Sequence, residues 1–188
     1  MSKEPLKTRL TLLPVVSADD VLPQYRQTPV GLLLEYQNLN RSFDTYPTAQ
    51  LLVGMCMDNR KMLRVPDNFA YILRAGGANF QRHQFKMSFA IAIGGVRALA
   101  IIGHDQCGMV GLRQRREAFV HGLVANAGWS AEDAAAHFDK YAADFEIHDA
   151  GEFVCAEAVR LRQYYPKVLV APLFYRVDEG LLYQLQED

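Results

Sequence analysis

Residues 51–56, Leu-Leu-Val-Gly-Met-Cys, form a short continuous apolar run that ends just before Asp58 and Arg60. A run of this length with a polar exit is typical of a strand buried on both faces. Similar apolar runs follow at residues 69–73, 98–102 and 168–171. Because buried strands that alternate with helices build parallel sheets, the sequence predicts an α/β domain with a mostly parallel central sheet flanked by helices.

Helices are predicted between these runs. Apolar spacing and stop signals place them at residues 30–40, 85–93, 109–124, 130–145 and 152–165, the second of them fully buried. Ser130 and Asp133 match a capping box at the start of the fourth helix. Two apolar segments, 173–177 and 181–185, flank a turn and predict a C-terminal hairpin. Residues 1–28, punctuated by prolines, predict an irregular arm with a short helix after Ser17.

Composition limits the classes of protein that fit. The chain has 188 residues, 50% of them hydrophobic, and a formal net charge of -1. This suits one folded domain over residues 1–188 and excludes a disordered chain. The near-zero charge gives no electrostatic basis for binding nucleic acid or an anionic membrane, and no apolar run approaches the roughly 18–20 residues that span a bilayer. Residues 1–10 lack the apolar segment of a secretory signal, so we expect a cytoplasmic protein.

The cysteines point to a metal site. Three are too few, and of the wrong parity, for a disulfide scaffold. Cys56 closes the first apolar run, and His104 and Cys107 follow the third. If those strands are neighbours, their ends lie about 5 Å apart and bring the three side chains together. Two thiolates and an imidazole suit tetrahedral Zn²⁺ and leave a fourth position for water or substrate. From the spacing alone, two core thiols and a loop histidine explain the pattern equally well.

Two motifs make the pattern specific. Residues 56–60, Cys-Met-Asp-Asn-Arg, resemble the Cys-x-Asp-x-Arg motif of the β-class carbonic anhydrases, and residues 103–108, Gly-His-Asp-Gln-Cys-Gly, resemble their Gly-His-x-x-Cys-Gly motif. The likeness runs from about residue 51 to residue 185 and is greatest to compact members of the family. It implies four parallel strands in the order 2-1-3-4, counted from residue 51, with zinc held by Cys56, His104 and Cys107. It also implies a homodimer or higher homo-oligomer, in which we expect the arm to embrace a second subunit.

The resemblance implies an activity, the reversible hydration of carbon dioxide to bicarbonate and a proton by zinc-bound hydroxide. Asp58 would accept a hydrogen bond from the attacking oxygen, and Arg60 would pair with Asp58 and keep it ionised. With that pair broken, Asp58 would take the fourth zinc position. Because two thiolates cancel the metal charge, we expect activity that rises toward alkaline pH. No proton shuttle is evident, and ordinary pKa alone makes candidates of His83, His121, His137 and His148.

Several readings stay open beside this one. Residues 74–77 are Arg-Ala-Gly-Gly where the family usually has Arg-Asn-Ala-Gly, and the N-terminal region lacks a clear copy of the Gly-Gln segment of larger members. The altered loop leaves room for hydrolysis of carbonyl sulfide or carbon disulfide on the same zinc site. A non-enzymatic zinc-binding protein of this fold is another alternative, although it would need neither Asp58 nor Arg60. A thiol redox protein is disfavoured because the sequence has no Cys-x-x-Cys pair.

The motifs assign no role to three further residues, Asp105, Gln106 and Cys155. Asp105 and Gln106 fill the variable positions of the second motif, where support of the ligands and a plain loop role fit equally. Cys155 falls within the fifth predicted helix and outside both motifs. We expect its thiol in the core.

Overall fold

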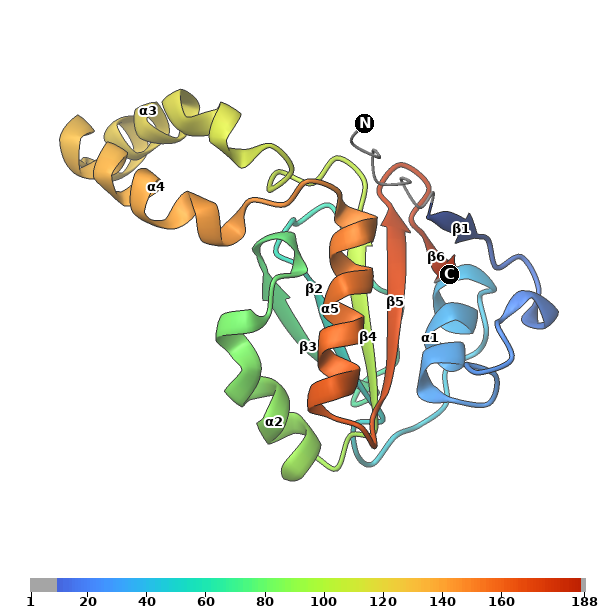
Figure 1. Ribbon diagram of the computed structural model, residues 1–188. Coiled ribbons are helices and arrows are strands. Elements are labelled where there is room, and N and C mark those ends of the chain that lie inside the picture. Colours follow the sequence, from blue (N-terminus) through green and yellow to red (C-terminus); the bar gives the residue numbers. More distant parts are fainter. Residues whose placement is uncertain (1–9, 187–188) are drawn as a thin grey trace, which may run out of the picture.

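The computed structural model describes residues 10–186 and is built around one six-stranded sheet in the order β1-β6-β5-β4-β2-β3 (Figure 1). The strands span Thr11–Leu13 (β1), Leu51–Cys56 (β2), Ala70–Ala75 (β3), Ala98–His104 (β4), Leu169–Arg176 (β5) and Leu181–Gln186 (β6). Strands β2 to β5 run parallel, whereas β6 pairs antiparallel with β5 and β1 antiparallel with β6. The expected order 2-1-3-4 is therefore found for the four parallel strands, and two antiparallel strands extend the sheet at one edge.

Helices cover both faces of this sheet. They span Pro29–Asn38 (α1), Gln84–Ala92 (α2), Arg116–Ala127 (α3), Ala131–Phe145 (α4) and Ala150–Tyr164 (α5), and short 3₁₀ helices span Ala18–Asp20 (η1), Gly76–Ala78 (η2), Gln81–His83 (η3) and Leu112–Arg115 (η4). The apolar side of α1 packs with one face of β2 and β4, and α2 and α5 pack with the other. Helices α3 and α4 pair with each other and extend away from the sheet (Figure 1).

Two expected apolar elements are less buried than predicted. Strand β3 lies at the edge of the sheet, and Tyr71 and Ile72 are exposed. Helix α2 was expected to be buried, but it places only Met87 and Ala90 in the core and leaves Phe85 and Phe89 exposed. Within the described residues, β3 and α2 each pack against the rest of the chain on one side only. Their apolar content does not reveal that the other side is exposed.

The third predicted helix begins later than expected. Residue 109 was expected to lie near its start, but a loop continues to Gly111, whose φ of 61° breaks a right-handed helix, and α3 begins at Arg116. The backbone of this loop pairs elsewhere, because Val110 forms a β-bridge with Ile147. That bridge ties the loop after β4 to the segment before α5.

One strand replaces two predicted segments near the C-terminus. Residues 168–171 and 173–177 were expected to be separate, but β5 runs without interruption from Leu169 to Arg176 through Pro172. The missing N–H of Pro172 is tolerated there because the pairing of β5 with β6 begins one residue later, at Leu173. The expected hairpin with β6 is present.

The described part of the arm, residues 10–28, packs against its own domain. Thr11–Leu13 adds a strand to the sheet, and the short helix expected after Ser17 is η1. Val15, Val21 and Tyr25 are buried in the core cluster of α1. Residues 1–9 of the arm lie outside the described part of the chain. Within residues 10–186, no helix has the length and apolar character needed to span a membrane.

Candidate metal centre

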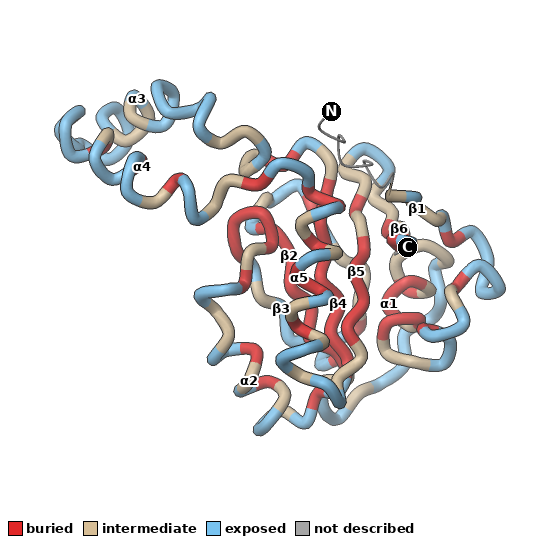
Figure 2. The backbone as a smooth tube through the Cα atoms, in the orientation of Figure 1, coloured by how far each residue is buried: buried red, intermediate tan, exposed pale blue. Residues whose placement is uncertain are grey.

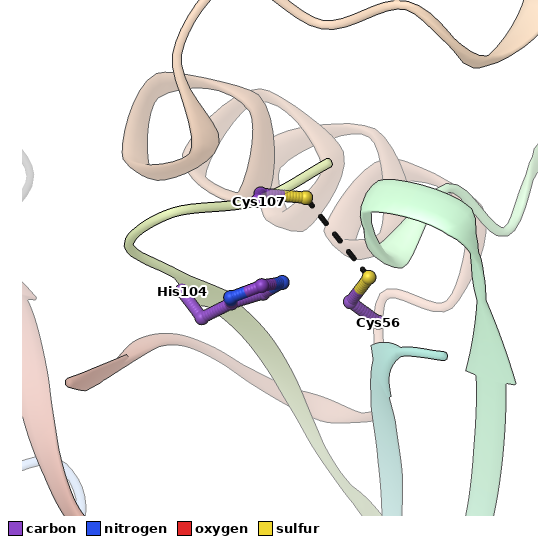
Figure 3. Close-up of side chains that lie close together, drawn as sticks. All are labelled: Cys56, His104 and Cys107. Carbon is purple, nitrogen blue, oxygen red and sulfur yellow. Dashed lines mark hydrogen bonds between the residues drawn. The ribbon is translucent and has the colours of Figure 1, made fainter. Parts of the chain in front are cut away.

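Cys56, His104 and Cys107 meet at one end of the sheet (Figure 3). Cys56 is the last residue of β2 and His104 the last of β4, and these two strands are parallel neighbours. Cys107 follows three residues after His104, where the chain turns back over the sheet edge. All three side chains are buried, and their ligand atoms lie within 4.8 Å of one another. The structure therefore brings together the three residues that the sequence analysis selected.

The geometry of this cluster fits a tetrahedral zinc ion. The Sγ atoms of Cys56 and Cys107 are 4.0 Å apart. Two thiolates at normal Zn–S distances in a tetrahedron are separated by about 3.8 Å. His104 has its Nδ1 atom 2.6 Å from the carbonyl oxygen of Asp105, which only a protonated Nδ1 can satisfy. The Nε2 atom is therefore left with its lone pair, and it is buried without a hydrogen-bond partner. Such an orphaned lone pair beside two thiols is what a metal ligand requires.

Electrostatics also favour a thiolate at this point. The hydrogen bond from the Cys107 thiol lowers the pKa of Cys56 to about 3, and the backbone amides of Asp58 and Gly77 act in the same direction against the effect of burial. The same hydrogen bond, together with burial, raises the pKa of Cys107. The Sγ atoms of Cys56 and Cys107 thus share one proton. A divalent cation bound between them would take the place of that proton and allow both sulfur atoms to be thiolates.

The glycine loop after β3 supports the cluster from the side. Gly77 has a φ of 63°, and a Cβ there would lie 3.3 Å from side-chain atoms of both Met109 and Ile147. Glycine lets the loop fit beneath those side chains and place its amide at the Cys56 sulfur. The departure from the family pattern at residues 74–77 therefore keeps a backbone donor at the metal centre.

Asp58 and Arg60 form a two-pronged ion pair beside the ligands. Arg60 donates from Nε to Asp58 Oδ1 at 3.1 Å and from Nη2 to Oδ2 at 2.7 Å. These hydrogen bonds hold the pKa of Asp58 well below its usual range. Of the two arrangements that the sequence left open, the structure shows the paired one, with the carboxylate engaged by the guanidinium.

Two cations that contact this loop, Lys61 and Arg74, were given no role by the sequence pattern. Lys61 is only 1% exposed, and its Nζ donates to the carbonyl oxygen of Asp58 at 3.2 Å. Burial lowers its pKa, and the neighbouring Cys56 and Asp58 oppose that shift. Arg74 donates to the carbonyl oxygens of Cys56, Asp58 and Lys61 at 3.1 to 3.3 Å. A lysine in a polar loop ordinarily signals solvent exposure, so no local signal marks Lys61 as part of the site.

An apolar pocket of about 270 Å³ is lined in part by neighbours of the candidate ligands, although by none of the three ligands themselves. One wall holds residues next to the ligands in sequence or space: Met57, Gly76 and Met109. The opposite wall comes from η4, α3 and α4: Leu112, Phe119, His137, Phe138, Tyr141, Ala142 and Phe145. A second, more polar cavity of about 450 Å³ reaches His104 and Cys107 from the side of α5. The cluster is thus bordered by an apolar and a polar space.

The remaining cysteine and histidines lie outside the cluster. Cys155 is on α5 and packs against the core shared with α2, as expected. His137 lines the apolar pocket, and its ring stacks on that of Phe119 with ring centroids 6.3 Å apart. His83, His121 and His148 lie on η3, on α3 and just before α5. None of these four belongs to the metal-ligating group of the described residues.

The comparisons with known proteins identify the fold. No family model matches the sequence, and no curated protein matches it. Among solved structures, a carbonic anhydrase from Glaciozyma antarctica is similar over 89% of this chain and 97% of its own, with a TM-score of 0.59 and 21% identity. A carbonic anhydrase from Streptococcus mutans is similar over 80% and 91%, with a TM-score of 0.57 and 17% identity. A carbon disulfide hydrolase is similar over 73% and 78%, with a TM-score of 0.54 and 19% identity.

Proposed function

Since the chain has the fold of the β-carbonic anhydrases, we propose that it is a zinc-dependent enzyme that hydrates carbon dioxide reversibly to bicarbonate and a proton. The observation that carries this proposal is the buried Cys56–His104–Cys107 cluster, whose imidazole has an unpartnered Nε2, beside an intact Asp58–Arg60 pair. Zinc held by these three residues would supply a nucleophilic oxygen near neutral pH by lowering the pKa of a water molecule.

The residues around the cluster would position that chemistry. Asp58, kept ionised by Arg60, is an acceptor for the proton of the attacking oxygen and so fixes the direction of its lone pair. The amide of Gly77 favours the Cys56 thiolate, and the buried ammonium of Lys61, which donates to the carbonyl oxygen of Asp58, would add positive charge near the thiolates. Since the thiolates already neutralise the metal, we expect the rate to rise toward alkaline pH, and a flat profile between about pH 6 and 9 would contradict this.

The apolar pocket suits the substrate class. Its walls are methionine, leucine and aromatic side chains, which favour a small uncharged molecule over an anion. Carbon dioxide is linear, apolar and uncharged, so it needs no electrostatic steering, and the near-neutral net charge of the chain is consistent with such a substrate. Bicarbonate would leave through the more polar cavity beside His104 and Cys107.

The same pocket supports a second candidate, hydrolysis of carbon disulfide or carbonyl sulfide. These substrates are also linear and apolar, and the carbon disulfide hydrolase is among the similar structures. Every metal ligand would be unchanged. The two activities are separated by measuring hydration of carbon dioxide and hydrolysis of both sulfur compounds on the same zinc-loaded sample.

The decisive experiment is stopped-flow hydration of carbon dioxide by the zinc-loaded protein and its Asp58→Ala variant. We expect the variant to keep its zinc and to lose about 100-fold or more in rate, because it lacks the positioning acceptor. Asp67→Ala, at an exposed loop aspartate, is the matched control and should remain active. Stoichiometric zinc without activity toward any of the three substrates would favour a non-enzymatic zinc protein, and full activity of Asp58→Ala would exclude the role given to the pair.

We also propose that the chain forms homodimers through an apolar face at the β3 edge. Tyr71 and Ile72 of β3 and Phe85, Phe89 and Ile93 at α2 are all exposed, from 42% to 82%. They lie on adjacent elements at the same edge of the sheet (Figure 1). Large apolar side chains gathered at an unpaired sheet edge are typical of a protein–protein interface, and an identical chain offers the same surface.

The oligomeric state of a charge variant tests this interface. Phe89→Glu places a carboxylate within the apolar face and is expected to shift sedimentation from dimer to monomer. Val124→Glu, at a 40% exposed position on α3, is the control and should sediment as the unmodified protein does. A Phe89→Glu protein that remains dimeric would place the interface elsewhere.

A further inference from the structure

The guanidinium of Arg60 is held on two sides. Asp58 accepts from Nε and Nη2 on one side. On the other side Gln106 provides two acceptors, its side-chain Oε1 at 2.8 Å from Nη1 and its backbone carbonyl oxygen at 3.1 Å from Nη2. The guanidinium therefore makes two hydrogen bonds to Gln106 and two to Asp58, and the Arg60 backbone amide adds a third to Asp58 Oδ1 at 3.0 Å. Because the pair itself is partly exposed, with side-chain accessibilities of 43% and 17%, Coulomb attraction alone would hold it only weakly.

Gln106 is in turn fixed by the C-terminal hairpin. Its Nε2 donates to Asp178 Oδ2 at 3.2 Å, in the turn between β5 and β6. Its φ of 55° is a left-handed conformation that few residues other than glycine and asparagine adopt readily. That conformation directs the carbonyl and the side chain of Gln106 to the same guanidinium. The preceding residue, Asp105, accepts from the amide of Val177 at 2.8 Å, so the loop is attached to the hairpin twice.

We propose that Gln106 is a positioning residue that holds Arg60 in its two-pronged contact with Asp58, using Asp178 as its own anchor. Without the Gln106 side chain the guanidinium loses the Oε1 acceptor and the loop loses its hydrogen bond to Asp178, so Arg60 swings toward solvent and the Asp58 carboxylate is released to turn toward the candidate metal centre. The hairpin thereby stabilises the arrangement in which Asp58 orients the attacking oxygen rather than occupying its place. This inference rests on the proposed function for its catalytic consequence, but its structural content, the restraint of Arg60, is independent of any substrate.

Three variants separate this relay, the hydrogen-bonded series Asp178–Gln106–Arg60, from a merely structural loop contact. Gln106→Ala removes the two side-chain hydrogen bonds of Gln106, one from Arg60 and one to Asp178. Gln106→Glu keeps the acceptor for Arg60 but places a second carboxylate oxygen against Asp178, and Asp178→Asn supplies the amide donor that restores this contact. The double variant Gln106→Glu with Asp178→Asn thus rebuilds the relay with its amide and carboxylate exchanged. Gln163→Ala, at an exposed glutamine of α5, is the control.

The first readout is the solvent exchange of the Arg60 Nε proton by NMR, on full-length zinc-loaded protein, and the second is kcat/KM for carbon dioxide. We expect Gln106→Ala and Gln106→Glu to accelerate exchange and to lower kcat/KM by about 10- to 100-fold, with zinc content unchanged. The double variant should recover most of both losses. Unchanged Arg60 exchange in Gln106→Ala, or a double variant no better than Gln106→Glu alone, would overturn the proposal. If the unmodified protein proves inactive while exchange responds as expected, the proposed function fails and the restraint of Arg60 stands.

Discussion

The strands β2 and β4 and the helical pair α3–α4 differ in how far their residues are buried. Every residue of the two strands is buried, whereas α3 has no buried residue and α4 has only Ala134, Phe138 and Ala142 (Figure 2). Two of the three candidate ligands end the buried strands. The far wall of the apolar pocket comes from the exposed helices and η4. The candidate metal centre therefore lies at the ends of the most buried strands, whereas the far wall of the pocket belongs to elements with little burial, which we expect to open more easily.

The largest effect is expected from removing a ligand at the end of these strands. Cys107→Ala leaves one thiol and one imidazole, and it should weaken zinc binding by more than about 100-fold, because losing a ligand costs more than losing an outer contact. Metal content after gel filtration measures this. Cys155→Ala, which changes a cysteine outside the cluster, should retain a full complement of zinc. Equal zinc content in the two variants would exclude the proposed ligand set.

The next largest effect concerns stability. We expect a substitution in the buried strands to destabilise the fold more than one in the exposed helices. Leu52→Ala in β2 removes a side chain that is 0% exposed and should lower the free energy of unfolding by about 2–5 kcal/mol. Val124→Ala in α3, where the side chain is 40% exposed, should change it by less than about 0.5 kcal/mol. Urea unfolding measures both. Similar losses would mean that α3 is covered in solution by a contact that the single chain does not show.

A smaller effect tests whether the helical pair opens by itself. The Ser130 hydroxyl caps α4 by accepting from the amide of Asp133 at 3.0 Å. Ser130→Ala should destabilise the helix by about 1 kcal/mol and so accelerate amide exchange in α4 by about fivefold. Amides of β4 should be unaffected. Equal acceleration in α4 and β4 would show that the helices and the sheet unfold as one cooperative unit.

The smallest effect concerns the ion pair that joins α3 to α4. Arg116 binds Asp139 through two contacts of 2.7 Å and thereby lowers the pKa of that carboxyl. A lowered pKa in the folded state contributes stability above the unfolded pKa of about 4, and the contribution is lost as pH falls through the folded value. Arg116→Gln should therefore reduce Tm slightly at pH 7 and leave it equal to that of the unmodified protein near pH 2. Both groups are exposed, so the difference should also shrink in high salt.

Local sequence was sufficient for the order of elements and for finding the three side chains that the fold brings together. Apolar runs of strand length mark β2 and β4, and Cys56 and His104, which end them, each belong to one of the two motifs. The N-cap at Ser130 and the hairpin around Gly180 are signals contained within a few residues, and both are present in the structure. The predicted capping box is only half formed, because the Asp133 carboxylate accepts from the Ser130 hydroxyl rather than from its backbone amide. Exposure was less predictable. The apolar side chains of β3 and α2 have the composition of a core, but no part of the described chain covers their outer side.

Periodicity and short motifs were enough to predict the parallel α/β sheet and the residue types able to hold zinc. The support that those residues receive is visible only in the folded chain. Gln106 lies 46 residues from Arg60 and 72 from Asp178, so their contacts depend on how β2, β4 and the hairpin are placed together. The burial of Lys61 and the orphaned Nε2 of His104 likewise arise from packing between distant segments. The physical reason is that a side chain's chemistry is local, whereas its partners and its exposure belong to the assembled fold.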